Sequence, residues 1–440
     1  MAKFARQTGK FYLASAIVAG CGLGCNGAAW AQLEEVVVTA QKRSENLQNV
    51  PIAITAFDAE AMEAKQITAV QDLRFTAPNV SYSKGNFTGS NFKIRGIGQD
   101  LVAATSDAGV GIHINDVPLQ DPRLYETEYY DIEQLVVLRG PQGTLYGRNS
   151  TGGAVNMITN RAALDELGGN IEGQYGNHDN VRLKGMINIP LGDTLAVRFA
   201  GISLQRDGYT RNLATGNDID DRDQWSLRGS LQWRPTDNTA INFMASYMDE
   251  NSSRTRSPKQ LCHNDPSGLL GCLPDKLAYD AVNPLAQLTG IIPSRLGPLG
   301  PQPGLTNDTA GVPRSLRKVA ADTDPKYQSD ETLAILRLEH QFTHHEMTVI
   351  TSYHDTSLTS QQDYTMNSSE VEFFPSPLLE GLAPITYATY FADNQLPISR
   401  QSRTNTGLVG GNIGGRSNSL DGFDISSANT EQYTFEANLA

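Results

Sequence analysis

Several features are scarce or absent in this chain of 440 residues, and each absence excludes a class of protein. Beyond the N-terminus there is no run of about 18 apolar residues, which excludes a membrane-spanning helix. Positive charge is in deficit, because 35 lysines and arginines face 48 aspartates and glutamates, and a net charge of −13 argues against a nucleic-acid groove. No Ser/His/Asp constellation and no clustered metal ligands stand out, so we expect no catalytic residue, no metal, no cofactor and no enzyme. A protein that crosses a membrane with strands remains open, since its alternating residues give a moderate mean hydropathy.

The first 31 residues are typical of a secretory signal peptide. A ten-residue apolar stretch, 11–20, follows a basic start and precedes a small-residue cleavage site. The residues that form the basic start and the cleavage site are Lys3, Arg6 and Lys10, and Ala29 and Ala31. An alternative is a lipoprotein box that ends at Cys21. Under the main interpretation the chain is exported and the mature protein begins at Gln32.

Five glycines crowd the stretch 132–161, IEQLVVLRGPQGTLYGRNSTGGAVNMITNR, between two short apolar strands. Glycine at this density indicates tight turns, because glycine adopts positive φ without a steric cost. The lack of a G-K-[ST] motif and of a following helix pattern excludes a phosphate-binding loop. The stretch resembles the end of the plug domain of TonB-dependent outer-membrane receptors. That resemblance implies an α+β plug domain inside an antiparallel transmembrane β-barrel.

The segment 32–45 follows the cleavage site and precedes the plug-like region. Its run EEVVVTA resembles the TonB box of the family, which binds the TonB protein of the inner-membrane energy complex. β-branched residues in a terminal segment suit edge-on pairing with a partner's sheet, although an ordinary N-terminal strand is the alternative. The expected TonB-binding residues are Glu34, Glu35, Val36, Val37, Val38, Thr39 and Ala40.

The plug domain is expected over residues 46–162. We predict an edge strand at 50–57, helices at 58–65 and 68–75, and strands at 92–96 and 111–116. Family resemblance implies that arginines at the positions of Arg95 and Arg139 pair with barrel glutamates and lock the plug in place. It also implies that three outer loops of the plug contact ligand, which here would include Phe87, Gln99 and Tyr125.

Alternation of apolar and polar residues marks the rest of the chain, 168–440, as the N-terminal part of a barrel. Trp225, Leu227 and Trp233 share one face, and Ser226 and Arg228 share the other. Short breaks alternate with long ones, including the long loops 251–329 and 360–428, as outer-membrane barrels require. We predict about eight strands of the twenty-two that the family's barrel contains, and hence a partial chain. The predicted strands are 168–176, 180–190, 194–205, 222–234, 239–249, 330–341, 346–359 and 429–440.

Four cysteines form two pairs, and Cys21 with Cys25 would leave with the signal peptide. Cys262 and Cys272 lie in the longest predicted loop. In an exported chain a disulfide between them is expected, closing a small loop.

The resemblance implies a monomer in the bacterial cell outer membrane that is surrounded by lipid and energised by TonB. Its ligand would be a scarce molecule, with iron–siderophore complexes first and cobalamins, sugars and aromatic compounds also open. Two alternatives remain: a surface binding or adhesion protein without transport, and a non-functional receptor fragment.

Overall fold

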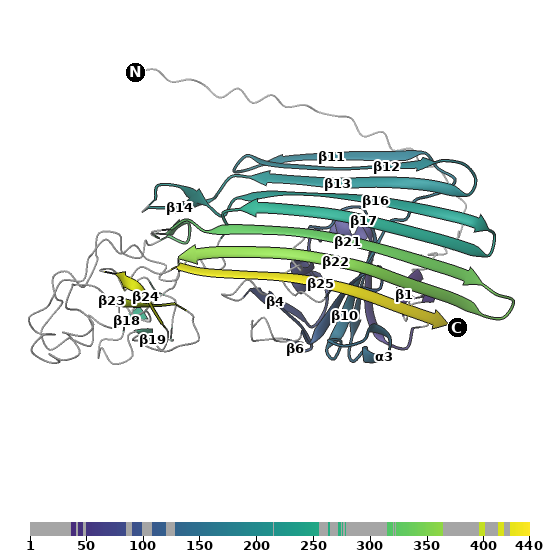
Figure 1. Ribbon diagram of the computed structural model, residues 1–440, viewed down its shortest axis with the longest axis horizontal. Coiled ribbons are helices and arrows are strands. Elements are labelled where there is room, and N and C mark those ends of the chain that lie inside the picture. Colours follow the sequence, from purple (N-terminus) through teal and green to yellow (C-terminus); the bar gives the residue numbers. More distant parts are fainter. Residues whose placement is uncertain are drawn as a thin grey trace, which may run out of the picture.

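A computed structural model describes residues 37–40, 43–46, 50–84, 90–98, 108–119, 128–213, 215–254, 263–264, 272–273, 275, 278, 315–319, 321, 323–363, 396–400, 412–417 and 423–440. Two bodies dominate the described part of the chain (Figure 1). A tall curved sheet forms a wall, and a smaller mixed sheet with short helices lies against the wall's inner face.

The wall is an eight-stranded antiparallel sheet in which each strand pairs with the next. Its strands confirm all eight predicted ones, and the later strands extend beyond the predicted ends. They range from 9 residues in β11 to 18 in β22, so the wall is much taller at one side than at the other. The strands are β11 (Gly168–Gly176), β12 (Asn180–Pro190), β13 (Leu195–Arg206), β16 (Arg222–Thr236), β17 (Thr239–Ser252), β21 (Lys326–Gln341), β22 (Glu346–Asp363) and β25 (Phe423–Leu439).

Period-two alternation separates the two faces of this wall. On β16 the side chains of Trp225, Leu227 and Trp233 are exposed on the outer face, whereas those of Ser226 and Arg228 are buried against the plug. An apolar outer face with a polar inner face is the pattern of a barrel wall in lipid. Among the described residues, no helix combines the length and the apolar character needed to cross a membrane.

The smaller body is the predicted plug, built on a five-stranded sheet in the order β3-β9-β10-β7-β8. Only β10 and β7 pair in parallel. As predicted, the first strand, β3, lies at an edge of the sheet, although it begins at Ala53 rather than at residue 50. The bounds are β3 (Ala53–Asp58), β7 (Val110–Ile114), β8 (Val117–Leu119), β9 (Ile132–Arg139) and β10 (Gly153–Thr159).

Short helices cover one face of the plug sheet. Helix α1 (Ala59–Ala64) begins at Asp58, whose carboxylate accepts a hydrogen bond from the Ala61 amide at 2.7 Å, as the sequence predicts. The predicted second helix is a 3₁₀ turn, η2 (Val70–Asp72), followed by α2 (Leu73–Thr76). Beside them lies a small sheet of β4 (Val80–Lys84), β5 (Ser90–Ile94) and β6 (Ile97–Gly98). Fully buried Leu73, Ile94 and Leu135 join these layers in one apolar core.

The glycine-rich stretch forms the β9–β10 hairpin, and a single helical turn, α3 (Gly143–Tyr146), lies in its loop. Gly153 has a φ of +153° and packs directly on β9. A Cβ added there would overlap the Leu138 carbonyl oxygen and approach Cδ1 of Ile94 to 2.8 Å. Glycine is therefore required at this position by close backbone approach.

Loops at the outer end of the wall carry a small sheet of β14 (Thr210–Asn212), β15 (Asp218–Ile219) and β20 (Lys318–Val319). Asp324 links these loops, because its carboxylate accepts hydrogen bonds from Asn212, Thr215 and Asn217 at 2.8, 2.7 and 2.6 Å. Burial alone would raise the pKa of Asp324, but these hydrogen bonds lower it below its usual value. The carboxylate therefore stays charged and holds two outer loops together at neutral pH.

Two shorter strand pairs also occur, β18 (His263–Asn264) with β19 (Cys272–Leu273) and β23 (Leu396–Arg400) with β24 (Asn412–Ser417). Cys272 lies in β19, but Cys262 lies outside the described residues. The disulfide stays a prediction. Thiol labelling of the oxidised, unfolded protein should find neither cysteine reactive, and two labelled thiols would contradict the bond.

Candidate functional site

Several charged contacts cross the boundary between plug and wall. Arginines on the inner faces of four wall strands, β12, β13, β16 and β21, reach two segments of the plug. One segment, 128–131, leads into β9. The other is the two-residue turn 115–116 between β7 and β8.

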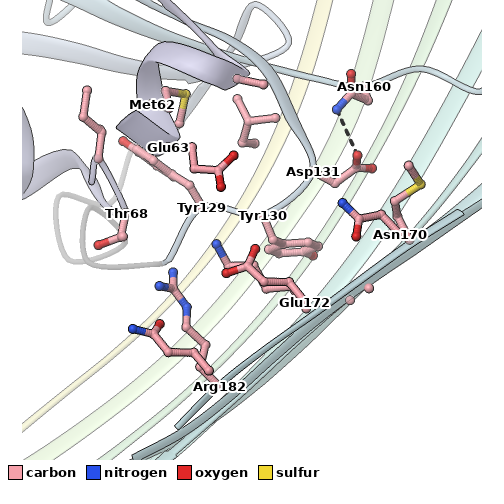
Figure 2. Close-up of a pocket in the computed structure, with 18 of the residues that line it drawn as sticks. Met62, Glu63, Thr68, Tyr129, Tyr130, Asp131, Asn160, Asn170, Glu172 and Arg182 are labelled. Atoms are coloured by element: carbon pink, nitrogen blue, oxygen red, sulfur yellow. Dashed lines mark hydrogen bonds between the residues drawn. The ribbon is translucent and has the colours of Figure 1, made fainter. Parts of the chain in front are cut away.

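Asp131 is held by the wall from one side and by the plug from the other. Arg198 of β13 donates two hydrogen bonds to its carboxylate, from Nε at 2.9 Å and from Nη2 at 2.5 Å. Asn160, just after β10, donates a third at 2.9 Å, as Figure 2 shows. The two charged side chains are only 11% and 7% exposed, so this is a desolvated, two-pronged ion pair of the strong kind.

Tyr130, the residue before Asp131, contacts the next wall strand, β16. Its hydroxyl lies 2.8 Å from Ser226 Oγ, and the Arg228 guanidinium lies 4.4 Å from the centre of its ring. Arg228 also donates to the Tyr130 and Asp131 carbonyl oxygens, both at 3.2 Å. A third residue of the segment, Glu128, pairs with Arg182 at 2.6 Å.

Asp116 forms the second contact. Its carboxylate pairs with Arg337 of β21 and accepts a hydrogen bond from the buried amide of Asn156 at 2.7 Å. Arg337 also lies 3.3 Å from Glu339. Glu339 in turn accepts two hydrogen bonds, at 3.0 and 3.2 Å, from Arg161 at the end of the plug. Alternating charges thus cross the plug–wall boundary twice.

A cavity of about 510 Å³ lies beside these contacts, between α1 and strands β11 to β13. Figure 2 shows Glu63 of the plug on one side and Glu172 and Arg182 of the wall on the other. Burial raises the pKa of Tyr129, which also lines the cavity, far above its usual value, and the charge of Asp72 adds to this effect. Tyr129 therefore stays neutral. The cavity can hold water or a polar solute.

The two predicted lock arginines lie elsewhere in the plug. Arg139 donates to the Ile54 carbonyl oxygen at 3.4 Å, and the Arg95 guanidinium lies near Gly140. Within the described residues no carboxylate pairs with either of them, and their lock role stays a prediction. The predicted kind of pair, a plug arginine with a barrel glutamate, occurs instead at Arg161 and Glu339.

Part of the predicted TonB-binding segment forms strand β1 (Val37–Ala40), which pairs with β2 (Arg43–Asn46). Glu34, Glu35 and Val36 lie outside the described residues. So do the three predicted ligand contacts, Phe87, Gln99 and Tyr125. No group of histidines, cysteines and acids suited to a metal ion occurs in the described part of the chain.

Sequence reasoning missed Asp116, Asp131, Arg161, Arg198 and Arg337. A usable signal existed for the arginines of the wall, because Arg198 and Arg337 each interrupt a largely apolar stretch of their strands. The aspartates follow Asn115 and Tyr130 and carry no comparable pattern.

Comparisons with known proteins agree with this arrangement. Residues 46–154 match the model of the TonB-dependent receptor plug domain. The chain is 30% identical over 190 residues to the pesticin receptor of Yersinia pestis, a match that covers 42% of this chain and 27% of that one. It is 28% identical over 184 residues to an iron-regulated outer membrane virulence protein of Vibrio cholerae, with 40% and 28% covered. The chain thus spans less than a third of these relatives.

The solved structure of the ferric yersiniabactin uptake receptor of Yersinia pestis has a similar fold. The TM-score is 0.53 at 19% identity, and the match covers 70% of this chain and 42% of that one. This likeness concerns the fold, a plug against the inner face of an antiparallel barrel wall.

Proposed function

Because the chain belongs to the TonB-dependent receptors of the bacterial outer membrane, we propose that it imports a scarce, large ligand actively across that membrane. The plug seated against the inner face of the wall carries this proposal, since a plugged barrel passes a solute only when the plug moves. In this proposal the segment 34–40 binds TonB, which supplies the force from the inner membrane. The receptor family is not an enzyme family, and we infer that the chain has no catalytic activity of its own.

An iron–siderophore complex is the ligand that we propose first. The names of similar proteins support it, since one is iron-regulated and another takes up ferric yersiniabactin. Cobalamins, sugars and aromatic compounds remain alternatives, because the outer loops determine which ligand binds and their sequences do not identify it. The domain plan belongs to the same proposal: a signal peptide over 1–31, a coupling segment over 32–45, a plug over 46–162 and barrel strands over 168–440.

Growth under iron starvation tests the proposal. A strain without its own siderophore receptors, supplied with this gene and a panel of ferric siderophores, should grow on at least one of them. Growth should disappear when TonB is deleted, because import against a gradient requires the energised partner. Binding of a ferric siderophore to cells without any growth would favour the surface-binding alternative. Growth that persists without TonB would contradict active import.

A further inference from the structure

We propose that Asp116 and Asp131 fasten the plug to the wall through Arg337 and Arg198, so that the main anchoring charges are carboxylates of the plug and arginines of the barrel. Both aspartates are assigned a positioning role. The proposal concerns retention of the plug at rest. It holds whichever ligand is imported, and also if the protein only binds its ligand.

Burial makes these two pairs strong anchors. The Asp116 and Arg337 side chains are 4% and 13% exposed, so each charge depends on its partner for solvation. Removal of Arg337 leaves the Asp116 carboxylate buried with only the Asn156 amide, and removal of Asp116 leaves Arg337 with Glu339 as its remaining carboxylate. Either loss is more unfavourable than loss of a surface ion pair. By contrast, the ion pair of Arg211 and Asp218 on the outer loops is exposed and contributes less to stability than the buried pairs.

The backbone at Asp116 gives a second, independent argument. Asn115 and Asp116 form a two-residue hairpin turn, with φ values of +49° and +70°. Glycine is the favoured residue at the second position of such a turn, because a side chain there strains the backbone. An aspartate in that position is unfavourable for the turn. Its carboxylate contacts Arg337 and Asn156, which explains why a side chain is present.

Asp131 likewise combines a left-handed backbone conformation with a buried ion pair to the wall. Its φ is +50°, again a left-handed conformation that L-residues rarely adopt. The carboxylate is held by Arg198 from the wall and by Asn160 from the plug, and its carbonyl oxygen by Arg228. Strained positions persist where surrounding contacts determine them, and they gather at clamps and switches. Two strained aspartates facing two wall arginines therefore indicate a clamp.

The Asp116→Gly variant distinguishes a role of Asp116 in shaping the turn from a role in anchoring the plug. If Asp116 only shapes the turn, Asp116→Gly should leave the plug as tight as before, since glycine suits the backbone better. If Asp116 anchors the plug, the variant should admit a large antibiotic such as vancomycin about tenfold faster, a change that needs a shift of only about 1.4 kcal/mol. The measurement compares antibiotic entry into cells that express the natural protein with entry into cells that express the variant. Heat-modifiable mobility on gels monitors barrel insertion in both.

Two further variants and a matched control complete the experiment. Asp116→Asn and Arg337→Gln should each increase entry, whereas the double variant should leak no more than the worse single one, because no unpaired charge remains. Asp179→Gly is the control: it changes another left-handed aspartate, in the β11–β12 turn, where its carboxylate accepts from Tyr175. Unchanged entry in Asp116→Gly would overturn the proposal. So would single effects that simply multiply in the double variant.

Discussion

Val37→Pro should abolish energised uptake while ligand capture at the cell surface stays unchanged. Proline removes the backbone N–H that a pairing strand requires and leaves a partner carbonyl without a donor. The two losses together amount to at least about 2 kcal/mol, which corresponds to more than a tenfold loss of pairing. Val37 is the first residue of β1 and far from the outer loops in sequence, so ligand binding should not change. Uptake and surface binding of a radiolabelled ferric siderophore measure the two quantities separately.

Val37→Thr is the matched control for this prediction, since threonine keeps the amide and the β-branched shape that strands favour. Uptake in that variant should remain near the natural level. If Val37→Pro cells import at the natural rate, the segment 34–40 is not the coupling site.

Gly153→Ala should have the largest effect on the plug itself. The new Cβ would overlap the Leu138 carbonyl oxygen at the loop end of the β9–β10 hairpin and press on Ile94, which is fully buried. Overpacking and backbone strain together would destabilise the plug by about 4 kcal/mol. The wall should survive, because its strands are held by their own ladder of backbone hydrogen bonds. Limited proteolysis of membranes should therefore cut the plug while the heat-modifiable barrel band persists.

Gly143→Ala is the corresponding control on the same glycine-rich stretch. A Cβ there meets no atom within 4 Å, and alanine favours the helical turn α3 more than glycine does. This variant should resist protease at least as well as the natural protein. Equal protease sensitivity of the two variants would mean that the close approach at Gly153 has no energetic weight.

The architecture could be predicted because its signals are local. Alternation at period two identifies all eight wall strands, and Asp58 followed by helix-forming residues identifies the start of α1. Strand ends were less predictable. β21 and β22 continue past the predicted boundaries through polar residues such as Gln328 and Gln361, which stay in the ladder because they pair with each other's strand. The end of the apolar pattern therefore marks where contact with lipid ends, whereas the strand itself continues.

The clamp could not be predicted for a different reason. Asp116 and Arg337 are separated by 221 residues, and only the placement of the plug against the wall brings them together. Family resemblance directed attention to Arg95 and Arg139, because they precede glycines in recognisable motifs. Arg161 lies at the end of the same motif and pairs with Glu339, yet nothing in its neighbours distinguishes it from a solvated arginine. Ion pairs between distant segments depend on registers that a single sequence does not reveal.

The unequal strand lengths of the wall determine how high its outer rim stands at each side. At about 3.3 Å per residue, the 9 residues of β11 extend roughly 30 Å and the 18 residues of β22 roughly 60 Å. On the outer face of β22 and β25, the ring centres of Tyr353 and Tyr433 lie 5.2 Å apart, and the next pair toward the outer end is Asp355 with Glu431. Tyrosines prefer the border of the hydrocarbon, and carboxylates avoid its interior.

We therefore expect the membrane surface to cross β22 near Tyr353, with the residues from Asp355 to the end of the strand in water. At the opposite side of the described wall, the 9-residue β11 joins β12 in a short turn. Among these eight strands, the outer rim of the wall is therefore lowest at that turn.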